Sequence, residues 1–144
     1  MIFEAKEEDV PQVAAIEKEL FSMPWSENGF LEAVCNPSAF VWIYKEDERI
    51  LGYLVMYTYI DEGEITNVAV VPEARNRGIG SALVKHAIAY AKKEAFRQIV
   101  LEVRKSNQSA IGVYETCGFV LLGERKNFYE KPREDAMIMA WQEN

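Results

Sequence analysis

The residues best placed for chemistry lie in a turn between an apolar segment, which ends at Pro72, and a helix predicted to begin near Gly78. The first amides of a helix have no partner within it, and the helix dipole makes that end partly positive, so phosphate oxygens bind there. Glycine at positions 78 and 80 lets the backbone approach a phosphate, while arginine adds full positive charge. The turn therefore predicts a phosphate-bearing ligand, with contacts from Arg75, Asn76, Arg77, Gly78, Ile79, Gly80 and Ser81.

Two common phosphate-binding loops do not fit this spacing. A nucleotide-binding P-loop ends in Gly-Lys-Ser or Gly-Lys-Thr, but Gly80 is followed directly by Ser81 and no lysine is present. A dinucleotide-binding turn needs a third glycine three residues after Gly80, where this chain has Leu83. The turn by itself leaves open the alternative that its glycines belong to an ordinary loop that binds no ligand.

Glu102 is the unusual residue of the predicted strand 98–104. In an alternating strand it lies on the face opposite Leu101 and Val103, beside Val100 and Arg104. A carboxylate among apolar neighbours has a raised pKa and can act as a general base toward an amine. The alternatives are a surface glutamate, a salt bridge to Arg104, or Glu64 of the preceding strand in the same role.

Tyr114 and Asn107 have one structural and one chemical interpretation each. Tyr114 lies in a short predicted helix, where it is either a core aromatic or a phenol that protonates a leaving thiolate. Asn107 precedes that helix and is either its N-cap or a ligand contact, and the two roles are compatible.

Composition limits the class of protein. The chain has 144 residues, 49% of them hydrophobic, which suits one domain over 1–144 with a single core. A formal net charge of −7 disfavours nucleic-acid binding, and no apolar run is long enough to cross a membrane. One histidine and two cysteines are too few for a zinc cluster, so no metal is expected. The charged first residues do not resemble a signal peptide, and we expect a cytoplasmic protein.

Periodicity and turn signals predict the order β-α-α-β-β-β-α-β-α-β-β, an α+β fold with a central mixed sheet flanked by helices. The expected strands are 2–5, 39–45, 50–60, 64–71, 98–104, 120–123 and 136–141, and the expected helices are 10–21, 26–34, 78–94 and 107–117. A loop is expected between the last two strands, over Arg125 to Tyr129.

Several segments resemble the GNAT superfamily of acetyl-CoA-dependent N-acetyltransferases. The spacing Arg-x-x-Gly-x-Gly at 75–80 is similar to the family's pyrophosphate-binding motif, and Tyr-Glu-x-x-Gly-Phe at 114–119 to its late tyrosine motif. The predicted order of elements also matches the GNAT fold over the whole chain. Within the superfamily, four segments together resemble the ribosomal-protein-alanine N-acetyltransferases: 24–27, 67–70, 101–107 and 133–139.

The resemblance implies roles for particular residues. It implies acetyl-CoA as cosubstrate, an N-terminal peptide of a ribosomal protein as acceptor, Glu102 as proton acceptor and Tyr114 as proton donor. It also implies acetyl-CoA contacts from Val68, Ala69 and Val70, from the turn 75–81, and from Asn107. The family's acceptor lies near the loop after Tyr129 and the Pro24-Trp25-Ser26 corner. Two alternatives remain open: a GNAT enzyme acting on a small amine such as a polyamine or aminoglycoside, and a non-catalytic acyl-CoA sensor.

Overall fold

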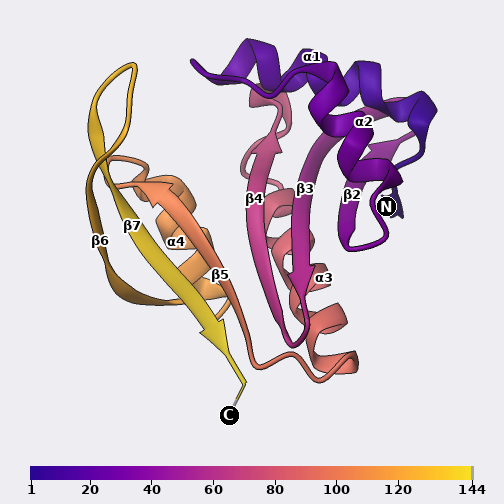
Figure 1. The fold of residues 1–144 in the computed structure, drawn as a ribbon. Coiled ribbons are helices and arrows are strands. Elements are labelled where there is room, and N and C mark those ends of the chain that lie inside the picture. Colours follow the sequence, from indigo (N-terminus) through magenta and orange to yellow (C-terminus); the bar gives the residue numbers. More distant parts are fainter. Residues whose placement is uncertain (144) are drawn as a thin grey trace.

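The computed structural model describes residues 1–143, which form a seven-stranded sheet with two helices on each face (Figure 1). The strands are β1 (Ile2–Glu4), β2 (Ala39–Glu46), β3 (Arg49–Tyr59), β4 (Glu62–Val70), β5 (Gln98–Arg104), β6 (Val120–Tyr129) and β7 (Glu134–Gln142). The helices are α1 (Val10–Leu20), α2 (Glu27–Cys35), α3 (Ile79–Lys93) and α4 (Gln108–Thr116), with 3₁₀ turns at Glu7–Asp9 and Pro72–Ala74. The predicted order of strands and long helices is confirmed.

The sheet has the order β1-β2-β3-β4-β5-β7-β6, and β4 and β5 form its parallel pair. Helices α1 and α2 cover one face through a core cluster that includes Val13 and Phe30. Helices α3 and α4 cover the other face, where Leu83 and Ala87 of α3 are fully buried. Within residues 1–143, none of these helices is both long and apolar enough to cross a membrane.

Helix α3 lies close to the sheet at its first turn because β3 has a glycine there. A Cβ at Gly52 would lie 2.9 Å from the carbonyl oxygen of Ala69 and 3.1 Å from Cγ2 of Ile79. A larger residue would therefore push the beginning of α3 away from β3 and β4. Gly52 thus helps to place the turn 75–81, which leads from β4 into α3.

The parallel pair β4–β5 is short, and the two strands then diverge (Figure 1). Their pairing runs from Glu62 opposite Gln98 to Ile65 opposite Leu101. Beyond it, β4 continues to pair with β3 on its other side, and the Val71 amide donates to the Leu51 carbonyl at 2.9 Å. Because successive amides of a strand point to opposite edges, those of Val68 and Val70 face the opening toward β5.

Three predicted caps are present. Ser26 Oγ accepts from the Gly29 amide at 3.1 Å, and Asn107 Oδ1 accepts from the Ala110 amide at 3.1 Å. Gly118 follows α4 with a φ of +99°, the left-handed conformation that favours glycine after a helix. These three residues show how local side-chain chemistry sets the ends of α2 and α4.

The expected loop over residues 125–129 is wrong, because these residues continue β6 to Tyr129. β6 is the edge strand of the sheet, and nearly all of its residues are exposed. Because both faces of this edge strand are exposed to solvent, its sequence lacks the alternation of apolar and polar residues by which a strand is predicted. Its pairing with β7 is also irregular between Arg125 and Tyr129, which interrupts the pattern further.

Candidate active site

A cleft of about 630 Å³ occupies the opening between β4 and β5. Its walls come from both strands, from the segment after α1, from the turn after β5, from α4 and from the end of the β6–β7 hairpin. Four of the predicted site residues line it: Val68, Glu102, Asn107 and Tyr114. Residues from three separate elements therefore meet around one space.

The other predicted residues lie outside this lining. Ala69 is buried in the core beneath α1 and α2, and Val70 and the turn 75–81 follow at the far end of β4. A ligand that reached both the cleft and the turn would therefore run along the open edge of β4. The contacts predicted for these residues stay predictions.

Glu102 lies half-buried on β5, with 24% of its side chain exposed. Burial raises the pKa of its carboxyl above the ordinary value, Arg125 on β6 opposes this rise, and Glu64 on β4 adds to it. Arg125 Nε lies 3.2 Å from Glu102 Oε2, but the angles do not make a hydrogen bond, and Oε2 is buried without one. A raised pKa suits a carboxylate that takes a proton from an amine.

The alternatives for Glu102 can now be compared with the structure. The proposed salt bridge to Arg104 is wrong, since Arg104 pairs with Glu134 at 3.2 Å and Glu102 has Arg125 as its cation. Glu64 lies outside the cleft lining and accepts a hydrogen bond from the Tyr59 hydroxyl at 3.3 Å. Glu102 is therefore the better placed of the two carboxylates.

Tyr114 belongs both to the core and to the cleft. Its side chain is 7% exposed and packs against Phe119 with ring centroids 5.8 Å apart. Burial, assisted by nearby Tyr129, raises the pKa of the phenol well above its ordinary value. The hydroxyl therefore stays protonated throughout the neutral range, as a proton donor must.

The turn 75–81 leads directly into the first turn of α3. Gly78 is the N-cap of α3 with a φ of +78°, and a Cβ there would meet no atom within 4 Å. The first intrahelical bond runs from the Ala82 amide to the Gly78 carbonyl at 2.9 Å. The amides of Ile79, Gly80 and Ser81 precede it, at the partly positive end of a 15-residue helix.

Both arginines of the turn contact other protein groups. Arg75 Nε donates to the Val70 carbonyl at 3.2 Å, and Arg77 forms an ion pair with Glu46 at the end of β2. Their charges remain beside the turn, but the backbone amides are the groups most directly placed for an anion. Asn107 Oδ1 is used by its helix cap, whereas no residue in 1–143 bonds its Nδ2.

Glu17 is a cleft residue that the sequence reasoning missed. It lies on α1 with only 3% exposed, and its oxygens accept from the Tyr53 hydroxyl at 2.7 Å, Asn67 Nδ2 at 3.1 and 3.3 Å, and the Trp25 amide at 3.0 Å. This network joins α1 and the segment before α2 to β3 and β4. The available signal was a carboxylate on the apolar face of a predicted helix.

Tyr129 was also missed, because it was assigned to a loop. It lines the cleft at the end of β6. Burial and the nearby Glu102 raise the pKa of its phenol to about 12. Lys131 and Pro132 follow it in the same wall of the cleft.

The comparisons with known proteins agree with this geometry. The model of the acetyltransferase (GNAT) family matches residues 8–119. A Bacillus subtilis (strain 168) relative, provisionally named as a ribosomal protein bS18-alanine N-acetyltransferase, is 37% identical over 133 residues, which are 92% of this chain and 88% of the relative. The Escherichia coli (strain K12) ribosomal protein bS18-alanine N-acetyltransferase is 33% identical over 138 residues, 92% of this chain and 90% of that protein. The crystal structure of the Escherichia coli ribosomal-protein-S18-alanine N-acetyltransferase has a TM-score of 0.91 and 31% identity, covering 99% of this chain and 92% of that one.

Proposed function

This chain belongs to the acetyltransferase (GNAT) family, and from that premise we propose that it acetylates the N-terminal α-amine of a ribosomal protein that begins with alanine, using acetyl-CoA. The observation that carries the proposal is the cleft between β4 and β5. A half-buried carboxylate of raised pKa, Glu102, and a protonated phenol, Tyr114, line the same space there. Acetyl transfer from a thioester to an amine uses two such groups: one accepts the proton of the amine, and the other donates a proton to the departing thiolate.

The residues present fit acetyl-CoA. The free edge of β4 at Val68 and Val70 offers backbone amides to an extended chain, and the first amides of α3 offer donors to phosphates. Asn107 Nδ2 would add a contact where β5 leads into α4. When bound, acetyl-CoA supplies an acetyl group activated as a thioester.

The protein's own groups would then act on the two substrates. Glu102 accepts a proton from the α-ammonium, whose ordinary pKa is about 7.7–8.0, directly or through water. A β4 amide donates to the oxygen that becomes negative as the amine attacks, an interaction typically worth about 2.7–4 kcal/mol. Tyr114 donates a proton to the departing thiolate. No protein residue becomes acylated in this series of steps.

The choice of acceptor is supported by the named activity of the relatives and by the residues that line the cleft around Trp25 and Tyr129. Met23 and Trp25 line the cleft together with Tyr129 and Pro132. This part of the cleft is open to solvent at Phe21 and Met23, which are 41% and 55% exposed. Such a shape suits the end of a peptide chain better than a small compact amine.

The test is an acetylation assay with two matched peptides. One begins with a free alanine and carries a basic second residue, and the other has the same sequence with a blocked α-amine and one internal lysine. Each is incubated with the protein and acetyl-CoA, together with a polyamine and an aminoglycoside in separate reactions, and products are identified by intact mass. Acetylation of the free α-amine is the expected result.

The other outcomes contradict the proposal in different ways. Acetylation of only the polyamine or aminoglycoside would replace the peptide acceptor by a small amine. Binding of acetyl-CoA without acetylation of any acceptor would favour a non-catalytic acyl-CoA sensor. Acetylation of the internal lysine alone would keep a protein substrate and move the reaction to side chains.

A further inference from the structure

The loop formed by residues 130–133, called here the 130–133 loop, makes one wall of the cleft at its acceptor end. It joins β6 to β7 and contributes Lys131 and Pro132 to the lining, directly after Tyr129. In Figure 1 the tip of the β6–β7 hairpin and α1 stand on either side of the opening between β4 and β5. The position of this loop therefore sets the width of the opening through which an acceptor enters.

The side chain of Arg104, at the end of β5, holds this loop by several contacts. Nη1 donates to the Pro132 carbonyl at 2.9 Å and Nη2 to the Glu130 carbonyl at 2.9 Å. Cζ lies 4.5 Å from the centroid of the Tyr129 ring, a cation–π contact. Within residues 1–143, the hydrogen bonds that reach the loop from outside the hairpin both come from Arg104.

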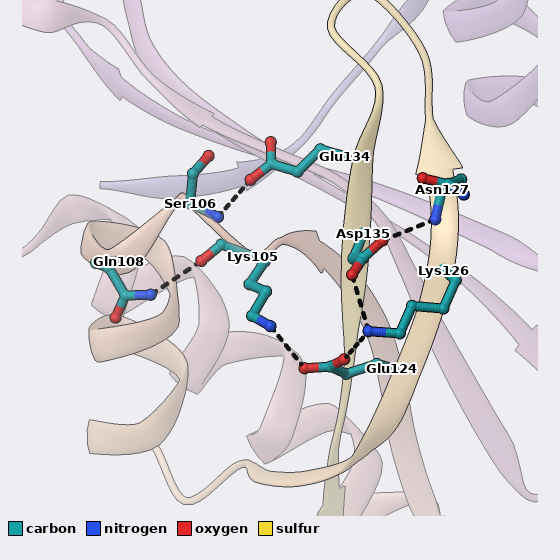
Figure 2. Close-up of polar contacts among 8 residues, drawn as sticks. All are labelled: Lys105, Ser106, Gln108, Glu124, Lys126, Asn127, Glu134 and Asp135. Carbon is teal, nitrogen blue, oxygen red and sulfur yellow. Dashed lines mark hydrogen bonds and ion pairs between the residues drawn. The ribbon is translucent and has the colours of Figure 1, made fainter.

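Arg104 is itself held in place. Its Nη1 also lies 3.2 Å from Glu134 Oε1, and Glu134 Oε2 accepts from the Ser106 amide at 2.6 Å. Figure 2 shows this Ser106–Glu134 bond, which links the turn after β5 to the beginning of β7. The Arg104 side chain is 25% exposed.

The stem of the same hairpin is held by a separate set of charges. Lys105 pairs with Glu124 at 3.2 Å, and Lys126 pairs with both Glu124 and Asp135 at 3.2 Å (Figure 2). Asp135 also accepts from the Asn127 amide at 2.8 Å. These contacts fix β6 against β7 and against the turn after β5, but they do not reach residues 130–133.

We propose that Arg104 is a positioning residue for the acceptor: it fixes the 130–133 loop and the Tyr129 ring as one wall of the cleft and so sets the affinity for the acceptor substrate. Arginine suits this role because its planar fork donates to two carbonyls at once while its face stacks on an aromatic ring. Lysine, whose ammonium is a compact charge without a planar face, cannot stack on the ring while it donates to both carbonyls. The inference deepens the proposed function and rests on it for the identity of the acceptor.

The test compares Arg104→Met and Arg104→Lys with Lys105→Met. The control removes the neighbouring cation, whose partner Glu124 keeps Lys126, and leaves the 130–133 loop untouched. Hydrogen–deuterium exchange of the segment 129–135, read by mass spectrometry without substrates, reports the order of the loop. Steady-state kinetics with the alanine-headed peptide, or with whichever amine the wild-type protein acetylates, gives KM for each substrate and kcat.

For Arg104→Met we expect faster exchange in the segment 129–135. We also expect the KM for the acceptor to rise about tenfold. The KM for acetyl-CoA and kcat are expected to stay within about twofold. Arg104→Lys is expected to recover only part of the loss, and Lys105→Met to behave as the wild type.

Two results would overturn the inference. Unchanged exchange in Arg104→Met would mean that other contacts hold the loop. Equal increases in both KM values, with a lower melting temperature, would mean that Arg104 acts only through general stability. A wild-type protein that acetylates no acceptor would instead refute the proposed function, and the exchange result would still show whether Arg104 orders the loop.

Discussion

The guanidinium of Arg125 on β6 lies against the carboxylate of Glu102 on β5, with Nε 3.2 Å from Oε2. Burial and Glu64 raise the pKa of Glu102, and Arg125 opposes this rise. The proposed general base thus has a pKa raised by its surroundings, and Arg125 limits that rise. The cation is 58% exposed, so its effect is partly screened by solvent.

Replacing Arg125 with Gln should therefore move the acidic limb of the kcat/KM profile to higher pH. Glu102 must be ionised to accept a proton, so activity rises with pH through its pKa, and removal of a nearby cation raises that pKa. We expect a modest shift, because Arg125 is more than half exposed and solvent screens its charge. Lys126→Gln, which removes a cation of the same strand that pairs with Glu124 and Asp135, should leave the limb in place. A limb that moves equally in both variants would indicate a general charge effect.

Replacing Glu102 with Gln should remove the acidic limb altogether. The amide has nearly the same shape but cannot accept the proton, so we expect kcat to fall about 10²- to 10⁴-fold. Binding of acetyl-CoA, measured by calorimetry, should be unchanged, because none of the expected contacts comes from Glu102. A variant that keeps both the rate and the pH profile would return Glu102 to the role of a half-buried structural residue.

Tyr114→Phe should slow turnover and preserve the fold. The phenol ring packs on Phe119, whereas its hydroxyl makes no hydrogen bond within the part of the chain that the structure describes. We expect the free energy of unfolding to change by less than about 0.5 kcal/mol and kcat to fall about 100-fold. Urea denaturation and steady-state kinetics measure the two quantities. An unchanged kcat would assign proton donation to water or to another group.

Glu17→Ala should destabilise the protein strongly. The change leaves the Tyr53 hydroxyl, the Asn67 amide and the Trp25 amide without their buried acceptor. We expect a loss of about 3 kcal/mol in the free energy of unfolding, from donors left unpaired in the interior. Glu19→Ala, at an exposed position of the same helix, is the matched control and should change stability by less than about 0.5 kcal/mol. Similar values for both variants would show that water replaces the lost acceptor.

Gly78→Ala should both destabilise the protein and weaken acetyl-CoA binding. The φ of +78° forces a side chain into the left-handed region, at a cost of about 1–2 kcal/mol. Gly112, in the middle of α4 with open space around it, is the opposite case, and its replacement by Ala should stabilise by about 0.5–1 kcal/mol. Urea denaturation and calorimetry with acetyl-CoA distinguish the two sites. Unchanged affinity in Gly78→Ala would place the phosphates elsewhere.

The sequence by itself determined the features that depend on near neighbours along the chain. Ser26 and Asn107 could be recognised as caps because each bonds an amide three residues ahead. The start of α3 next to Gly78 followed from the change of residue pattern at the turn. The order of elements followed from hydrophobic periodicity, since the strands and helices of the interior bury one face in a regular pattern.

Only the tertiary structure decided which distant groups meet. The partner of Glu102 is Arg125, 23 positions away on an edge strand whose extent the exposed pattern of β6 concealed, and not Arg104 two positions away. Glu17 likewise joins residues of β3 and β4 that are 36 and 50 positions away. Such pairs are set by sheet order and by the divergence of β4 from β5, which depend on the packing of the whole chain rather than on any local pattern of residues.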